Sequence, residues 1–168
     1  HNNTNMLVKV TEVEHYTDRL FRFKTERPVS FRFAAGEFTM VGIEKQNQTI
    51  PKRAYSMTSG PYDDFIEFLS IKVADGPLTS ILQNIKVGDE IYVGDKPTGT
   101  LTIANLELGG NLWLLATGTG IAPYVSILRD PDLFKSFDRV NVVWTTRLIS
   151  EQVCFKDLIT KTASSFYS

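Results

Sequence analysis

The sequence predicts an antiparallel β-sheet or barrel followed by the beginning of a parallel α/β unit. From Met6 to about Thr102, short β-type segments alternate with turns, which is typical of antiparallel sheets and barrels. From Asn111 the pattern changes to a buried strand, a glycine loop and a helix, and then to a second strand and a second helical pattern. This order is typical of a β-α-β-α unit. The 168 residues suit one domain and part of another.

Five segments of the first part have strand-like patterns: Leu7–Val13, Leu20–Lys24, Phe38–Ile43, Phe65–Val73 and Glu90–Val93. In the clearest, Phe65–Val73, alternate residues share one face. Glu67 interrupts the apolar alternation on that face, which places its end of the strand at a sheet margin. A short helix is expected after Asp75-Gly76-Pro77, with Pro77 in its first turn. Its apolar residues recur at helical spacing: Leu78, Ile81, Leu82 and Ile85.

The second part is expected to be an incomplete α/β domain. Its second strand is predicted at Val140–Thr145 and its second helix at Glu151–Ile159. Parallel sheets normally have both faces covered and more than two strands, so we expect exposed apolar sheet surface and an unpaired strand edge. The join near Asn105–Asn111, which contains two glycines, divides the chain into residues 6–105 and 111–168.

Composition excludes several classes of protein. Apolar residues make up 42% and charged residues 22%, with Lys+Arg at 18 against Asp+Glu at 19, so the chain should fold and has no positive excess to attract nucleic acid or an anionic membrane. The longest apolar run, Leu112–Ala116, is too short to span a bilayer. Cys154 is the only cysteine, which agrees with a reducing compartment and predicts a cytoplasmic protein. No metal site is expected, since His1 and His15 lack partners at ligand spacing.

The first candidate constellation is Arg53-Ala54-Tyr55-Ser56, just before the clearest strand. A planar heterocyclic cofactor with a diphosphate requires an aromatic face, a guanidinium and a hydroxyl. In an extended segment Arg53 and Tyr55 share one face and Ser56 points across. The same residues are also compatible with a solvated arginine, a half-buried tyrosine and a serine without a role.

The second constellation is Gly76-Pro77-Leu78-Thr79-Ser80, which leads into the short helix. Free amides at a helix start, together with two hydroxyls, can hold phosphate oxygens. Simple capping of the helix by a hydroxyl-rich turn explains the same pattern.

The third constellation is Leu112–Pro123, a buried strand that runs into Gly118-Thr119-Gly120 and then a helix with Pro123 near its first turn. This is a dinucleotide-type loop. It lacks the third glycine of the Rossmann fingerprint, and Asp138 precedes the second strand instead of ending it. Arg147 follows that strand, where ligands of open α/β sheets lie. A tight turn with an exposed arginine is the competing interpretation.

The remaining conspicuous residues are expected to have structural roles. Trp113 and Trp144, like most of the phenylalanines, are assigned to the core. Cys154 is expected to pack on an apolar helix face, because no base motif accompanies it. Asp63-Asp64 is interpreted as a turn between strands.

In combination, these motifs resemble the bacterial ferredoxin/flavodoxin–NADP⁺ reductases. The resemblance rests on segments that occur in order over nearly the whole chain up to Arg147: Phe31–Val41, Arg53–Ser56, Phe68–Val73, Asp75–Ser80, Lys96–Leu101 and Ala116–Pro123. It implies a six-stranded antiparallel FAD-binding barrel followed by a nucleotide-binding α/β domain. Family members continue well beyond the second helix of that domain, and Lys161–Ser168 does not resemble them.

The resemblance also implies roles for individual residues. Arg53 would bind the FAD diphosphate and Tyr55 would stack on the isoalloxazine, with Ala54 beside them and Ser56 near flavin N5; Tyr55 and Ser56 are the candidate catalytic residues. The other implied cofactor-binding residues are Phe68, Leu69, Ser70 and Lys72 on the adenosine and ribityl side, Gly76, Leu78, Thr79 and Ser80 at the phosphate turn, Thr119 and Gly120 where the nicotinamide approaches, and Arg147 at the NADP phosphates.

The implied activity is hydride transfer from NADPH to FAD and single-electron delivery to ferredoxin or flavodoxin. Two alternatives stay open at this point. The chain could hold FAD without productive nicotinamide turnover, because the nucleotide domain is incomplete. It could also be a barrel-type binding domain with no cofactor, although the ordered motifs argue against this.

Overall fold

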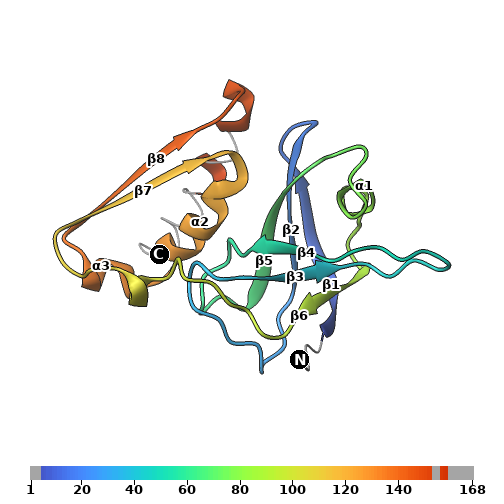
Figure 1. The fold of residues 1–168 in the computed structure, drawn as a ribbon, viewed down its shortest axis with the longest axis horizontal. Helices are drawn as coiled ribbons and strands as arrows, with labels where there is room; N and C mark the ends of the chain where they lie inside the picture. Colours follow the sequence, from blue (N-terminus) through green and yellow to red (C-terminus); the bar gives the residue numbers. More distant parts are fainter. Residues whose placement is uncertain (1–4, 153–155, 159–168) are drawn as a thin grey trace.

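The computed structural model describes residues 5–152 and 156–158. Figure 1 shows a β-barrel beside a smaller unit of strands and helices. The six barrel strands pair in the order β4-β3-β6-β1-β2-β5, and every pairing is antiparallel. Their bounds are β1 Asn5–His15, β2 Leu20–Glu26, β3 Phe38–Gly42, β4 Arg53–Ser56, β5 Phe65–Ile71 and β6 Glu90–Gly94.

The two end strands of this order approach each other and nearly close the barrel. Met57 forms an isolated antiparallel bridge with Phe68, and the Thr58 amide donates to the Glu67 carbonyl at 2.9 Å. Inside, the β2 and β5 side chains Phe23 and Phe68 lie opposite each other with ring centroids 5.3 Å apart. Both are completely buried in the barrel core. The predicted six-stranded antiparallel barrel is therefore confirmed.

The short helix α1 spans Thr79–Leu82 and lies against the barrel core. It begins later than expected: Leu78 is its N-cap, and Pro77 precedes the helix instead of occupying its first turn. Leu78 and Leu82 are almost completely buried, as their spacing predicts. Among the residues that the structure describes, no side chain forms a capping hydrogen bond at this N-cap.

The second part has two parallel strands, β7 (Asn111–Thr117) and β8 (Arg139–Thr145). Helix α2 (Ala122–Leu128) follows β7 through the 3₁₀ turn Gly118–Ile121, and Pro123 lies in its first turn as predicted. The other short elements are α3 Leu133–Ser136, η1 Ile103–Asn105 and η3 Ile149–Glu151. Cys154 and the end of the predicted helix at Ile159 lie outside the described residues.

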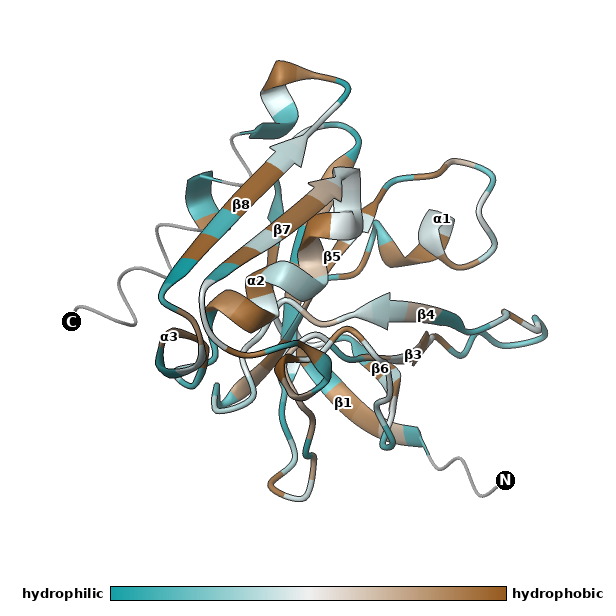
Figure 2. Ribbon diagram, turned by 60° about the vertical axis from the view of Figure 1, so that its left-hand side comes forward, coloured by the Kyte–Doolittle hydropathy of each residue, from teal (hydrophilic) through white to brown (hydrophobic). Residues whose placement is uncertain are grey.

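One face of the two-stranded sheet is covered and the other is exposed. Leu112 and Leu114 are buried with α2 residues, whereas alternate residues of β7 point outward. Trp113 is 61% exposed and Leu115 63%, with Val143 of β8 at 44%. Figure 2 shows these two strands side by side with hydrophobic positions along both. The expectation of exposed apolar sheet surface is confirmed, and the core assignment of Trp113 is wrong because the described residues cover only one face.

The covered face of the α/β unit packs directly on the barrel. Leu20 of β2 and Leu69 of β5 share an apolar cluster with Ile121, Ala122 and Val125 at the start of α2. Burying apolar side chains on both sides of a contact favours a fixed arrangement of the two parts. Within the part of the chain that the structure describes, no helix has the length and apolar character needed to cross a membrane, and no acidic, histidine or cysteine cluster could hold a metal ion.

Candidate functional site

A cleft of about 390 Å³ lies between the barrel and the α/β unit. Strands β4 and β5 form one side, and the 3₁₀ turn η2 (Gly118–Ile121) with the start of α2 forms the other. It brings together many of the residues that the sequence singled out. The lining residues are Arg53, Ala54, Tyr55, Ser56, Leu69, Ser70, Ile71, Thr119, Gly120, Ala122 and Pro123.

Tyr55 is the aromatic residue of this cleft, and it is half-buried. Its ring packs edge-on against Phe68, with centroids 6.1 Å apart and ring planes at 78°. Its hydroxyl is 3.0 Å from the Ser70 hydroxyl on β5. Burial raises the pKa of Tyr55, against the opposing effects of the Ser70 hydrogen bond and the Arg53 charge. The ring is thus held at a fixed angle in its protonated form at neutral pH.

Arg53 and Ser56 mark the two ends of β4. The strand pairs with β3, with Arg53 opposite Val41 at one end and Ser56 opposite Phe38 at the other. This pairing fixes the direction of each side chain. Arg53 is exposed, and its guanidinium makes one hydrogen bond, to the Lys52 carbonyl at 3.3 Å, among the described residues. Its other donors face solvent and are available to an anion.

The opposite wall is the glycine turn after β7. Gly118 has φ +52°, a left-handed conformation that favours glycine. Its carbonyl accepts a hydrogen bond of 2.8 Å from the Trp144 indole, which ties the turn to β8. An added Cβ at Gly120 would have nothing within 4 Å, so the backbone there faces open space. The cleft is thus open on the side of Thr119 and Gly120.

The remaining predicted residues do not line this cleft. Phe68 lies beneath Tyr55 in the barrel core. The Lys72 ammonium donates to the Thr17 carbonyl at 3.0 Å. Arg147 is exposed beyond the end of β8.

The 76–80 turn also lies outside the cleft. Leu78 is buried, and the Thr79 hydroxyl donates to the Val73 carbonyl at 3.3 Å. An added Cβ at Gly76 would come within 2.1 Å of that hydroxyl oxygen, so the turn is tightly packed. Ser80 lines a separate hollow with Glu44 and Asn84.

Sequence reasoning missed a buried ionic network behind the cleft. The sequence placed the Glu67 end of β5 at a sheet margin. In the structure Glu67 pairs with Lys24 of β2 and is completely buried, because Arg129 of the α/β unit covers it. It is paired with Arg22 of β2 and with Arg129 at the end of α2. A carboxylate in the middle of an apolar strand could have indicated buried partners, because an unpaired buried charge is very unfavourable.

The barrel wall and the glycine turn share one cleft, which contains an aromatic face, a guanidinium and hydroxyls. This combination is typical of a module that holds a dinucleotide-type redox cofactor. The sequence model for the oxidoreductase FAD-binding domain matches residues 5–103. The chain therefore belongs to the family of oxidoreductase FAD-binding domains.

Similar proteins extend this assignment. The chain is 51% identical over 142 residues to "Ferredoxin--NADP reductase A" of Sorangium cellulosum, which covers 84% of the chain and 51% of that relative. It is 46% identical over 153 residues to a ferredoxin–NADP reductase of Pseudomonas aeruginosa, covering 91% of the chain and 58% of the relative. The chain thus spans about half the length of these curated relatives.

A solved structure of a ferredoxin NADP⁺ reductase from Neisseria gonorrhoeae, with bound FAD and NADP, superposes with a TM-score of 0.86 at 33% identity. That superposition covers 93% of the chain and 63% of the other protein. A flavohemoglobin from Malassezia yamatoensis has the same fold at 19% identity and a TM-score of 0.81. The architecture of barrel and α/β unit is therefore common to the chain and to these flavoproteins.

Proposed function

We propose that this chain is the FAD-binding part, with the beginning of the nicotinamide-nucleotide-binding part, of a reductase that passes electrons between NADPH and ferredoxin or flavodoxin. One observation carries the proposal. The Arg53–Ser56 strand and the Thr119–Gly120 turn line a single cleft, although Ser56 and Thr119 are 63 residues apart in the sequence. In this proposal residues 6–105 hold FAD, and residues 111–168 begin the nucleotide-binding domain. The reductases named above support it.

The donor set of the cleft fits FAD. Tyr55 offers a ring face to the cleft, Arg53 offers guanidinium donors for a diphosphate, and Ser56 offers a hydroxyl. Leu69 and Ser70 of β5 would line the adenosine and ribityl side. When bound, FAD supplies the redox chemistry, as acceptor of a hydride from NADPH and donor of single electrons to the protein partner. The role of the chain is to bind and orient the two nucleotides.

We propose individual roles for the residues of the cleft. Tyr55 would stack on the isoalloxazine, Ser56 would lie near its N5 atom, and Arg53 would hold the diphosphate. The bare backbone at Gly120 leaves room for the nicotinamide to approach. Phe68 supports Tyr55 from below.

The residues outside the cleft have a place along an extended cofactor. We propose that Lys72 and the 76–80 turn contact the adenosine and phosphate portions of FAD, and that Arg147 meets the phosphates of NADPH. The single cysteine agrees with a cytoplasmic location for this reductase.

A second candidate function is an FAD-binding module without nicotinamide turnover. It is favoured by the exposed apolar face of β7 and β8, because parallel sheets that bind nucleotides normally have both faces covered. The two candidates predict different chemistry with the same cofactor.

A single titration tests both candidates. The purified chain is loaded with FAD, and the visible flavin band is followed without air as NADPH is added. Bleaching of the band supports the reductase. A stable flavin band in excess NADPH supports the binding module instead, and a chain that takes up no added FAD excludes both.

A further inference from the structure

Two elements connect the cleft to a buried ionic network. Strand β5 lines the cleft with Leu69 and Ser70, and it carries Glu67 two residues earlier. Helix α2 lines the opposite side with Ala122 and Pro123 and ends at its C-cap Arg129. Each element therefore lines the cleft with some of its residues and carries a charged residue away from the cleft, in the middle of β5 and at the C-cap of α2.

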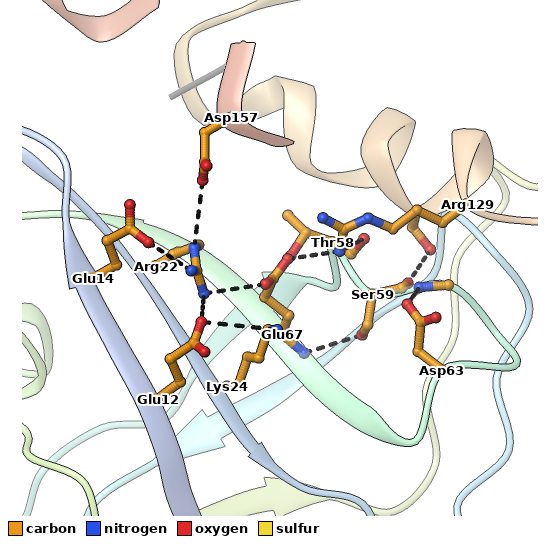
Figure 3. Close-up of polar contacts among 12 residues, drawn as sticks. Glu12, Glu14, Arg22, Lys24, Thr58, Ser59, Asp63, Glu67, Arg129 and Asp157 are labelled. Atoms are coloured by element: carbon orange, nitrogen blue, oxygen red, sulfur yellow. Dashed lines mark hydrogen bonds and ion pairs between the residues drawn. The ribbon is translucent and has the colours of Figure 1, made fainter. Parts of the chain in front are cut away.

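Glu67 and Arg129 form an ion pair. Figure 3 shows Glu67 between Arg129 and Arg22. One Arg129 nitrogen is 2.7 Å from Glu67 Oε1 and 3.1 Å from the Thr58 carbonyl, and Glu67 Oε2 is 3.4 Å from Arg22. Glu67 is completely buried, and Arg22 and Arg129 have side chains 2% and 6% exposed.

The barrel supports its own side of this network. Arg22 is also paired with Glu12 and Glu14 of the neighbouring strand β1. Burial alone would lower the pKa of Arg22, but the hydrogen bond to Glu12 and the surrounding carboxylates raise it above its ordinary value. Arg22 therefore stays charged and holds Glu67 in place, so that Arg129 meets a fixed carboxylate.

A second contact lies one helical turn earlier on α2. The Ser126 hydroxyl donates to the Ser59 carbonyl at 2.7 Å and accepts from the Gly36 amide at 3.3 Å. At Gly60 the chain approaches so closely that an added Cβ would lie 2.8 Å from the Arg129 carbonyl oxygen. The end of α2 is thus held by directional contacts, whereas its start is held by apolar packing.

We propose that Glu67 and Arg129 are positioning residues, whose ion pair sets the distance between the Thr119–Gly120 turn and the Tyr55 face. This inference rests on the proposed function, because it concerns the approach of the nicotinamide to the flavin. Apolar packing alone is non-directional and permits sliding. A buried, hydrogen-bonded ion pair has few alternative arrangements, so it fixes α2 relative to β5 at one register.

The first test uses the chain without cofactor, so it does not depend on FAD binding. Arg129→Met removes the ion pair but keeps side-chain bulk. In this variant the rate of amide hydrogen exchange, measured by mass spectrometry, should rise by about tenfold or more over residues 118–128 and β7. The exchange rates of β1 and β6 should stay within about threefold of those in the original chain. Arg129→Lys, which keeps the charge, should restore most of the protection. Equal acceleration in both parts would overturn the proposal.

A matched control separates the ion pair from general barrel stability. Glu14→Gln removes a carboxylate from Arg22 without altering the pair between Glu67 and Arg129. Its exchange pattern should leave residues 118–128 protected. If exchange over residues 118–128 is as fast in Glu14→Gln as in Arg129→Met, the protection of this segment depends on barrel stability in general. That result would contradict the role assigned to the ion pair.

The second test measures position in the FAD-loaded chain. Both tryptophans, Trp113 and Trp144, lie in the α/β unit, so quenching of their emission by FAD in the barrel reports how closely the two parts approach. At saturating FAD, Arg129→Met should lose part of this quenching and of the visible circular dichroism of the flavin, and Arg129→Lys should regain both. Unchanged signals at saturation would refute a positioning role even if stability falls. Failure of the original chain to bind FAD would overturn the proposed function and this positioning role, while the exchange test would still report whether the ion pair holds α2.

Discussion

Tyr55→Ala is expected to weaken FAD retention because it removes the aromatic face of the cleft. Phe68 meets the Tyr55 ring edge-on at 78° and lies in the barrel core, so it does not line the cleft and cannot replace that face. Aromatic pairs contribute about 0.5–1.5 kcal/mol beyond the area that they bury. With the apolar contact that is also lost, we expect about 1.5–2 kcal/mol, which corresponds to roughly tenfold to thirtyfold weaker binding.

The control for this prediction is Tyr55→Phe, which keeps the ring and removes only the hydroxyl that contacts Ser70. Its FAD affinity should stay within about fivefold, because a single hydrogen bond contributes about 1 kcal/mol or less. Affinities are measured by titrating the cofactor-free chain with FAD and following flavin fluorescence. Equal weakening by both variants, or unchanged binding by Tyr55→Ala, would show that the ring does not stack on the flavin.

Four further predictions concern Arg53, the Tyr55 proton, Ser70 and Gly36. Arg53→Ala should loosen FAD but spare riboflavin, which has no diphosphate; equal losses in the two binding titrations would exclude a diphosphate contact. Burial raises the pKa of Tyr55, so the folded chain holds this proton more tightly than the unfolded chain, and stability should fall as pH rises above about 10. Ser70→Ala should raise that pKa further in a phenolate absorbance titration, since the Ser70 hydrogen bond lowers it; a decrease would contradict the contact. Gly36→Ala should lower the melting temperature far more than Gly88→Ala does. The expected loss in the free energy of unfolding for Gly36→Ala is at least about 2 kcal/mol. Both glycines have φ near +95°, but only Gly36 would place a Cβ 1.8 Å from a carbonyl oxygen; similar melting temperatures would refute the steric argument.

The barrel could be predicted because its signals are local. Alternating side chains and turn residues specify strands wherever they occur, and the predicted segments correspond to β1, β2, β3, β5 and β6. The short β4 was anticipated only as an extended motif around Tyr55. Helix α1 was located from apolar spacing, but its start was misplaced because Pro77 is followed by a separate N-cap residue.

The candidate site could be predicted in part. The residue types that give the site its chemistry can be read from short segments of the sequence. Arg53, Tyr55 and the 118–120 loop are therefore predicted as separate motifs. Their meeting in one cleft depends on how α2 docks on β5, which no single segment encodes. The 76–80 turn lies outside this cleft, although both carry groups suited to a phosphate.

The sequence by itself determined the class of the chain, since the order of local patterns already indicates an antiparallel barrel and a following α/β unit. Only the tertiary structure decided which charged and aromatic residues are buried. Glu67 is enclosed and Trp113 is exposed, the reverse of what their polarity suggests. The physical reason is that burial depends on what another segment covers: Arg22 and Arg129 converge on Glu67 from distant positions, while no described segment covers the outer face of β7.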